Sequence, residues 1–340
     1  MAQISFFKPS LFRKDMDAVL QTMVDEKIGP GEKKRAFVKS YADYIGLRDG
    51  VALRSYIDAI AIALKSLGLG EGDTVALSVF TPQIYLDAFK RLAIKPLLVD
   101  VDDDMMPSLE ALGENLESIK AVVLFEPLGN FVADGEGYRE LGVPVIEDIT
   151  QAVGSGYSEI KPGKTGNIVI ASTEEDSLVS TAGGAIILSD NEETVALMKK
   201  EINPYIELPD MNAALGIVQL GKLGSIVQRR SSIYKIYLDE ARRRGRVKVF
   251  GSSDLEFKTN GYGFSCVTND RPDEVIEMAK KYSVTVRKTF SSSVGARYQD
   301  RYDRFPKAFE YLSRGVSFPL YPFLSNAEIQ TVQKVIGILR

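Results

Sequence analysis

The sequence predicts an α/β protein with a mostly parallel central sheet that is covered by helices on both faces. Short strands rich in Val, Ile and Leu alternate with amphipathic helical patterns through the first two-thirds of the chain. The segment at 121–125 reads AVVLF, an unbroken apolar run that is typical of a strand buried on both faces. With 340 residues the chain is long enough for a large core and for two domains.

The expected elements follow one another in a regular order. Strands are predicted at 74–79, 96–101, 121–125, 143–146, 167–172 and 185–188. Helices are predicted at 54–67, 83–92, 107–116 and 192–201, and a long helix at 211–244. Strands separated by helices of this kind form parallel sheets, because each helix brings the chain back to the end of the sheet at which the previous strand began.

A smaller α+β domain is expected after the basic turn ARRRGR at 241–246. Strand, helix and strand patterns at 262–267, 273–282 and 284–287 precede a terminal helix that Ser325 and Glu328 open as a capping box. The predicted division is a large domain at 1–244 and a small domain at 245–340.

Composition excludes several classes of function. The net charge of −4 gives no reason to expect a nucleic acid or a membrane surface as partner, and no apolar run approaches the ~20 residues of a membrane span. The chain contains no histidine, which excludes catalysis by a histidine base and most zinc chemistry, so no metal is expected. Cys266 is the only cysteine; it is expected to be a buried strand thiol, in keeping with a cytoplasmic location.

Two stretches carry a family resemblance. VPVIEDITQAVG at 143–154 is a strand followed by a Glu-Asp-x-x-Gln signature, and NIVIASTEEDSLVSTAGGAIIL at 167–188 is a strand, an acidic loop and a second strand. Blocks at 37–46, 67–77, 92–102, 213–223 and 317–329 extend the similarity along the chain. In these blocks the sequence resembles the DegT/StrS family of nucleotide-sugar aminotransferases. The resemblance implies the fold-type-I architecture of pyridoxal-phosphate (PLP) transferases and a homodimer.

The resemblance places four residues at the cofactor. It implies that Asp148 would pair with the pyridine nitrogen, which keeps the ring an electron sink. Gln151 would lie beside the ring hydroxyl, one helical turn later on the same face. Ser172 matches the serine of the family's Ser-Phe-x-x-x-Lys motif, and Ser177 then occupies the lysine position. Serine cannot form the aldimine, because that bond requires a primary amine.

Other positions depart from the family in the same direction. The Gly-Thr phosphate cradle aligns with Tyr56 and Ile57. The family's aromatic residue that stacks on the ring aligns with Pro82, and a family histidine aligns with Val153. The acidic run at 174–176 would lie near the cofactor phosphate and repel it. No resident cofactor is therefore expected, although PLP or its amine form (PMP) could bind without a covalent bond.

These residues also have structural explanations. Asp148 and Gln151 have the spacing of a helix capping box, which would be reason enough for both. The run at 174–176 is either a solvated loop or a cation site, and the glycines at 183–184 form either a tight turn or a phosphate-binding nest. GKT at 163–165 lacks the first glycine of a P-loop. Lys161 and Lys164 precede a strand, where they are poor substitutes for the missing amine.

The sequence hypothesis is a catalytically degenerate aminotransferase homologue that binds a sugar nucleotide, a phosphate or a partner protein in sugar or polysaccharide metabolism. One form of it is a regulatory subunit beside an active paralogue. The alternative is an active PLP- or PMP-dependent aminotransferase, or a lysine-free sugar dehydratase; the dehydratases use a histidine that this chain lacks.

Overall fold

The computed structural model describes residues 3–251, 256–298 and 300–340. Its central feature is a seven-stranded sheet in the order β1-β8-β7-β5-β4-β2-β3. The strands are β1 (Asp49–Leu53), β2 (Thr74–Ser78), β3 (Lys95–Val99), β4 (Ala121–Phe125), β5 (Val145–Asp148), β7 (Ile168–Ser172) and β8 (Ala185–Ser189). The five strands from β3 to β7 are parallel, whereas β8 and β1 are antiparallel to their neighbours. The α/β fold with a mostly parallel sheet is confirmed.

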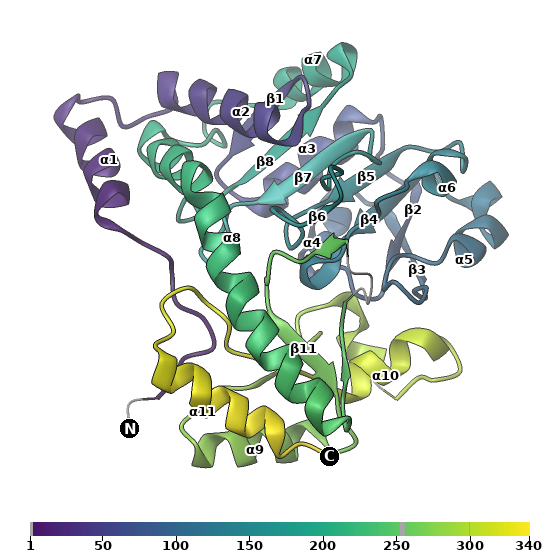
Figure 1. Ribbon diagram of the computed structural model, residues 1–340. Coiled ribbons are helices and arrows are strands. Elements are labelled where there is room, and N and C mark those ends of the chain that lie inside the picture. Colours follow the sequence, from purple (N-terminus) through teal and green to yellow (C-terminus); the bar gives the residue numbers. More distant parts are fainter. Residues whose placement is uncertain (1–2, 252–255, 299) are drawn as a thin grey trace.

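Helices cover both faces of this sheet (Figure 1). The helices of this part of the chain are α2 (Glu32–Ile45), α3 (Tyr56–Ser66), α4 (Ile84–Arg91), α5 (Leu109–Glu114), α6 (Glu136–Arg139) and α7 (Glu192–Glu201). Side chains of α3 and α4 pack in one apolar cluster with residues of the sheet, and side chains of α2 pack in another. Strands β4, β7 and β8 have no exposed residue, because helices cover both of their faces. This burial explains why their sequences are apolar without alternation.

A second, four-stranded sheet forms from the last third of the chain. Its order is β12-β13-β11-β9, with β9 (Lys248–Val249), β11 (Phe264–Val267), β12 (Arg287–Lys288) and β13 (Gly315–Phe318). Helices α9 (Pro272–Lys281), α10 (Pro306–Arg314) and α11 (Asn326–Gly337) accompany it. Cys266 lies in β11 and is buried, and burial raises the pKa of its thiol to about 12, as expected of an inert core thiol.

The long helix α8 (Asp210–Arg244) runs from the seven-stranded sheet to the four-stranded sheet (Figure 1). Helices α1 (Arg13–Val24), α2 and α11 pack along it. It ends at Gly245, whose left-handed φ of 61° suits a residue without a Cβ. None of the described helices is long and apolar enough to cross a membrane.

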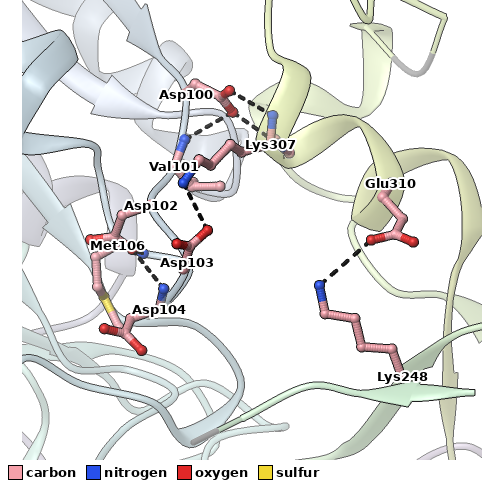
Figure 2. Close-up of polar contacts among 10 residues, drawn as sticks. Asp100, Val101, Asp102, Asp103, Asp104, Met106, Lys248, Lys307 and Glu310 are labelled. Atoms are coloured by element: carbon pink, nitrogen blue, oxygen red, sulfur yellow. Dashed lines mark hydrogen bonds and ion pairs between the residues drawn. The ribbon is translucent and has the colours of Figure 1, made fainter.

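A polar contact joins the loop after β3 to the start of α10 (Figure 2). The Asp100 carboxylate accepts hydrogen bonds from the backbone amides of Lys307 (2.8 Å) and Ala308 (2.9 Å). The Lys307 ammonium group lies 2.7 Å from the Asp103 carboxylate. Asp100 therefore satisfies two amides in the first turn of α10 across a sequence separation of more than 200 residues.

Some predicted elements are shifted or were missed. Strand β5 occupies Val145–Asp148, two residues later than predicted, because Pro144 lacks the donor that a ladder position needs. The strand expected at 284–287 is reduced to β12, and Val284 instead pairs with Ile4 of the N-terminal segment. Helix α11 does open with the predicted capping box of Ser325 and Glu328. The division into two domains at 244/245 stays a prediction.

Candidate functional site

Three buried acids lie together at the carboxyl ends of two adjacent parallel strands. Glu126 directly follows β4, and Glu147 and Asp148 end β5. The strand register pairs Phe125 with Asp148, and the Glu126 amide donates to the Asp148 carbonyl at 3.0 Å. All three side chains have no exposed surface. In open α/β sheets this edge is where ligands bind, so the partners of these acids decide what the site can do.

The Asp148 carboxylate is enclosed by side chains of the protein itself. Its Oδ2 atom accepts hydrogen bonds from the Tyr56 hydroxyl and from the Tyr85 hydroxyl, the latter at 2.6 Å. Its Oδ1 atom accepts from the Thr150 amide at 2.9 Å. Burial raises the pKa of Asp148, although these hydrogen bonds oppose the shift. Burial and the Asp148 charge raise the pKa of both tyrosines well above 10, so both remain donors.

Glu147 holds a loop in place. Its two carboxylate oxygens accept hydrogen bonds from the amides of Gly163 (2.6 Å), Thr165 (2.7 Å) and Gly166 (2.7 Å). Burial raises the pKa of Glu147, and the amide donors oppose the rise. The GKT segment is thus ordered around a buried carboxylate of the protein, as a structural loop rather than an open phosphate cradle. Two lysines of this loop donate to carbonyls at the end of α2: Lys161 to Tyr44 and Lys164 to Gly46.

Glu126 is the least satisfied of the three acids. Its Oε1 atom accepts from the Val132 amide at 3.0 Å, whereas Oε2 has no hydrogen-bond partner among the described residues. Burial, followed by the charge of Glu147, raises the pKa of Glu126 well above its usual range. A buried carboxyl without enough donors is more stable in its neutral form, so this environment favours the neutral form of Glu126.

The predicted capping box of Asp148 and Gln151 is wrong, because no helix begins at this point. Residues 150–154 form turns, and Asp148 binds the amide two residues ahead, which is an Asx-turn contact. The Gln151 side chain points elsewhere: its Oε1 atom accepts from the Leu128 amide at 2.7 Å. The assumption that Gln151 lies one helical turn beyond Asp148 is wrong for the same reason.

Ser172 and Ser177 are close together in the loop after β7. Their hydroxyl oxygens are 3.4 Å apart, and Ser172 also accepts from the Glu174 amide at 3.3 Å. Glu175 and Asp176 are exposed, in agreement with the solvated-loop interpretation of the acidic run. The Ser172 amide donates to the Thr150 hydroxyl at 2.9 Å, which joins this loop to the turn after Asp148.

Tyr56 and Ile57 form the first turn of α3. Ser55 caps this helix, accepting from the Asp58 amide, and the Ser55 hydroxyl also donates to the Asp58 carboxylate. The helix therefore begins with a negative charge of its own, which compensates the positive end of its dipole. Ile57 packs against the apolar cluster under the sheet. Pro82 pairs with Ser293 in an isolated antiparallel bridge.

Three residues of this region were missed by the sequence analysis. Tyr85 is a tyrosine on the apolar face of a helix, which in sequence resembles any core aromatic residue. Glu126, directly after the strand AVVLF, had a signal, since an acid that ends a buried strand is unusual. Arg230, in the middle of α8, is 5% exposed and had no distinguishing sequence signal.

Comparison with known proteins assigns the family. The DegT/DnrJ/EryC1/StrS aminotransferase family model matches residues 9–337. The chain belongs to this family. It is 23% identical, over 95% of its length and 94% of the relative's, to the spore coat polysaccharide biosynthesis protein SpsC of Bacillus subtilis. It is 26% identical, over 69% of its length and 68% of the relative's, to UDP-4-amino-4,6-dideoxy-N-acetyl-beta-L-altrosamine transaminase of Campylobacter jejuni.

Solved structures of the family share the fold. A putative sugar aminotransferase from Streptococcus pneumoniae in its PLP form has a TM-score of 0.89, with 18% identity and 98% of each chain covered. The aminotransferase TlmJ from Streptoalloteichus hindustanus has a TM-score of 0.87, with 20% identity and 98% and 97% of the two chains covered. A GDP-4-keto-6-deoxy-D-mannose-3-dehydratase from E. coli with bound hydrated PLP has a TM-score of 0.86, with 16% identity and 99% and 100% covered.

The contacts of Asp148 in this chain do not fit a pyridinium partner. A pyridinium nitrogen would compete with these donors, because Oδ2 already accepts two tyrosine hydroxyls and Oδ1 accepts an amide. The carboxyl group also has no exposed surface. The position that the resemblance assigns to the aldimine lysine is Ser177, which has no amine.

Proposed function

We propose that this protein is a non-catalytic homologue of the nucleotide-sugar aminotransferases that binds a small ligand or a partner protein in sugar or polysaccharide metabolism. The observation that carries the proposal is the pair of tyrosine hydroxyls on Asp148. They give this carboxylate a structural role in place of a cofactor contact. Tyr56 is also the residue that the resemblance aligns with the glycine of the phosphate cradle. A tyrosine at this position therefore affects both the phosphate cradle and the aspartate that would pair with the pyridine nitrogen.

The other aligned positions support the same proposal. The first turn of α3 brings Asp58, an anion, to the place where the family's cradle would meet a phosphate. The loop with Ser177 adds two exposed acids, Glu175 and Asp176. A PLP phosphate carries about two negative charges at neutral pH, so each of these acids disfavours its binding.

We further propose that the protein forms a homodimer through α1. This helix packs on α8 with one face and exposes apolar side chains on another: Met16 (56% exposed), Leu20 (56%), Met23 (55%) and Val24 (75%). The spacing of four and three residues places them in one stripe along the helix. Figure 1 shows α1 at the edge of the molecule, away from both sheets, where a second copy can reach it. A stripe of this kind is typical of a protein–protein contact.

One experiment separates the non-catalytic homologue from the active enzyme. The purified protein is incubated with PLP, its visible absorption is recorded, and it is reduced with borohydride before intact-mass measurement. The proposal expects no aldimine absorption and no added mass. A family relative that retains the lysine serves as the positive control.

The Ser177→Lys variant sharpens the result. If Tyr56 and Tyr85 occupy Asp148, restoring the amine alone leaves cofactor binding weak, and Tyr56→Phe with Tyr85→Phe must be added to free the carboxylate. A borohydride-stable adduct on one specific lysine of the parent protein would contradict the proposal. Tight PLP or PMP binding without an adduct would favour the lysine-free enzyme instead.

A further inference from the structure

A small cavity lies beside Ser177, between the N-terminal segment and α8. Its volume is about 240 Å³. Pro9 and Ser10 line it on one side, Ser177 and Ser180 on a second, and Gln219 and Arg230 of α8 on a third. The volume is below the 300–1,000 Å³ of pockets that hold drug-sized ligands, and it suits an anion or a small polar group.

The N-terminal wall of this cavity is fixed by buried polar contacts. Gln219, 2% exposed, donates from Nε2 to the Ser10 carbonyl at 3.0 Å. The Lys222 ammonium group, one turn further along α8, lies 3.0 Å from the Asp15 carboxylate, which is 1% exposed. Because α8 holds the segment at both points, the cavity is part of the folded structure and does not depend on a loose terminus.

Arg230 provides a buried positive charge at this cavity. The side chain is 5% exposed, and it donates from Nε to the Gly261 carbonyl (2.8 Å) and from Nη2 to the Tyr262 carbonyl (2.6 Å). Among the described residues, no carboxylate forms an ion pair with this guanidinium group, and Nη1 makes no hydrogen bond to protein but keeps access to solvent. Neutral carbonyls satisfy two nitrogens but leave the charge without a counter-ion.

A buried charge of this kind is costly unless an opposite charge compensates it. Burial lowers the pKa of Arg230 to about 10, which expresses the same penalty. Of the residues that line the cavity, Glu175 carries a negative charge; it is exposed and forms no ion pair with Arg230 in the described part of the chain. A negatively charged ligand would remove the penalty and would also meet the hydroxyls of Ser177 and Ser180.

We propose that this cavity binds a small oxyanion, in particular a phosphate group, with Arg230 as its charge partner and Ser177 and Ser180 as neutral donors. The inference rests on the proposed function, since it assigns the segment that replaces the aldimine lysine to ligand binding. The ligand is either free phosphate or the phosphate group of a larger molecule, such as a sugar phosphate, whose remainder would project from the cavity. Glu175 at the rim weakens the binding of either one.

The test is thermal unfolding of the full chain in inorganic phosphate, against chloride at equal ionic strength. Phosphate is expected to raise Tm by about 2 °C at ten times its dissociation constant. Ser177→Glu places a carboxylate at the cavity, so it should raise Tm without phosphate and abolish the phosphate effect. Ser118→Glu, the same change at an exposed position outside the cavity, should retain that effect in full.

Arg230→Met should lose the phosphate effect as well, but it also removes the donors to Gly261 and Tyr262, so Ser177→Glu is the decisive variant. Phosphorus NMR titration then compares inorganic phosphate with a hexose 1-phosphate: tighter binding of the ester identifies a phosphorylated sugar, and tighter binding of phosphate identifies the free anion. An unchanged phosphate effect in Ser177→Glu, or none in the parent, would overturn the inference. These two phosphate results leave the proposed function untouched, because they do not concern PLP. A borohydride-stable lysine adduct would contradict the proposed function and would not by itself test phosphate binding.

Discussion

The Tyr85 hydroxyl donates a hydrogen bond of 2.6 Å to the Asp148 carboxylate, inside a helix–sheet interface where both residues are fully buried. Tyr85 belongs to α4 and Asp148 to the end of β5, so the bond joins the helix to the functional edge of the sheet. Together with Tyr56 it takes Oδ2, the atom that lacks a backbone donor. The carboxylate that the resemblance places at the family's cofactor is thus hydrogen-bonded by two side chains of this chain.

Tyr85→Phe is expected to destabilise the protein by about 1–3 kcal/mol, because it leaves a buried carboxylate with one donor fewer. The measurement is urea unfolding at neutral pH. Tyr237→Phe is the matched control, since the Tyr237 hydroxyl is buried without a hydrogen-bond partner among the described residues. Within the described part of the chain that variant loses no hydrogen bond and removes an unpaired buried hydroxyl, so it should not be destabilised. Equal losses in the two variants would show that the bond to Asp148 contributes nothing specific.

Glu126→Gln is expected to stabilise the protein increasingly as the pH rises. The raised pKa of Glu126 means that the folded state holds a proton that the unfolded state releases at lower pH. Its contribution to stability is complete below the ordinary pKa of 4.5 and is lost as the pH rises through the folded-state pKa. Glutamine resembles the protonated acid and still accepts from the Val132 amide, so the parent should lose up to ~1.4 kcal/mol per pH unit relative to the variant.

Urea unfolding between pH 5 and pH 9 checks this slope. Glu147→Gln is the contrasting variant. Both Glu147 oxygens accept backbone amides, from Gly163, Thr165 and Gly166, and glutamine replaces one of these acceptors with an amide nitrogen that only donates. It should destabilise the protein by about 2 kcal/mol or more. Parallel pH profiles for the parent and Glu126→Gln would mean that Glu126 is ionised in the folded protein.

The architecture was predictable because buried parallel strands have a local signature. The strand at 121–125 and the helix at 192–201 have the predicted bounds, and α8 begins within one residue of its predicted start. The edge strand β1 was missed, since its sequence DGVAL is short and carries a polar start. Element type follows from local periodicity, whereas the pairing of β1 with β8 is decided by contacts far apart in the sequence.

The site was predictable only in part, because its residues are joined by long-range contacts. The sequence identified Asp148 and Tyr56 as relevant positions, but not that one binds the other across 92 residues. It also suggested a capping box, since Asp-x-x-Gln fits that spacing. In the structure the tyrosine hydroxyls bind the Asp148 carboxylate, and the Leu128 amide binds the Gln151 side-chain oxygen. The buried charge of Arg230 is invisible in a helix whose sequence contains several exposed arginines.

Asp100→Ala is expected to destabilise the contact between the β3 loop and α10 by about 1 kcal/mol, because two amides in the first turn of the helix lose their acceptor. Amide hydrogen exchange should accelerate in α10 before it does in the seven-stranded sheet. Asp103→Ala removes only the exposed ion pair with Lys307 (Figure 2) and should leave both measurements unchanged. Equal exchange rates in α10 for the parent and Asp100→Ala would show that the cap is not needed.

Met16→Asp combined with Leu20→Asp is expected to convert a homodimer to a monomer, because it places two charges in the apolar stripe of α1. Light scattering coupled to size-exclusion chromatography, over a range of protein concentrations, measures the mass. Gln21→Asp introduces one such charge at an exposed position of α1 outside the stripe and should leave the mass unchanged. Far-UV circular dichroism confirms that the variants remain folded. A parent protein with the mass of one 37.5 kDa chain at all concentrations would refute the dimer, and a dimeric double variant would move the interface away from α1.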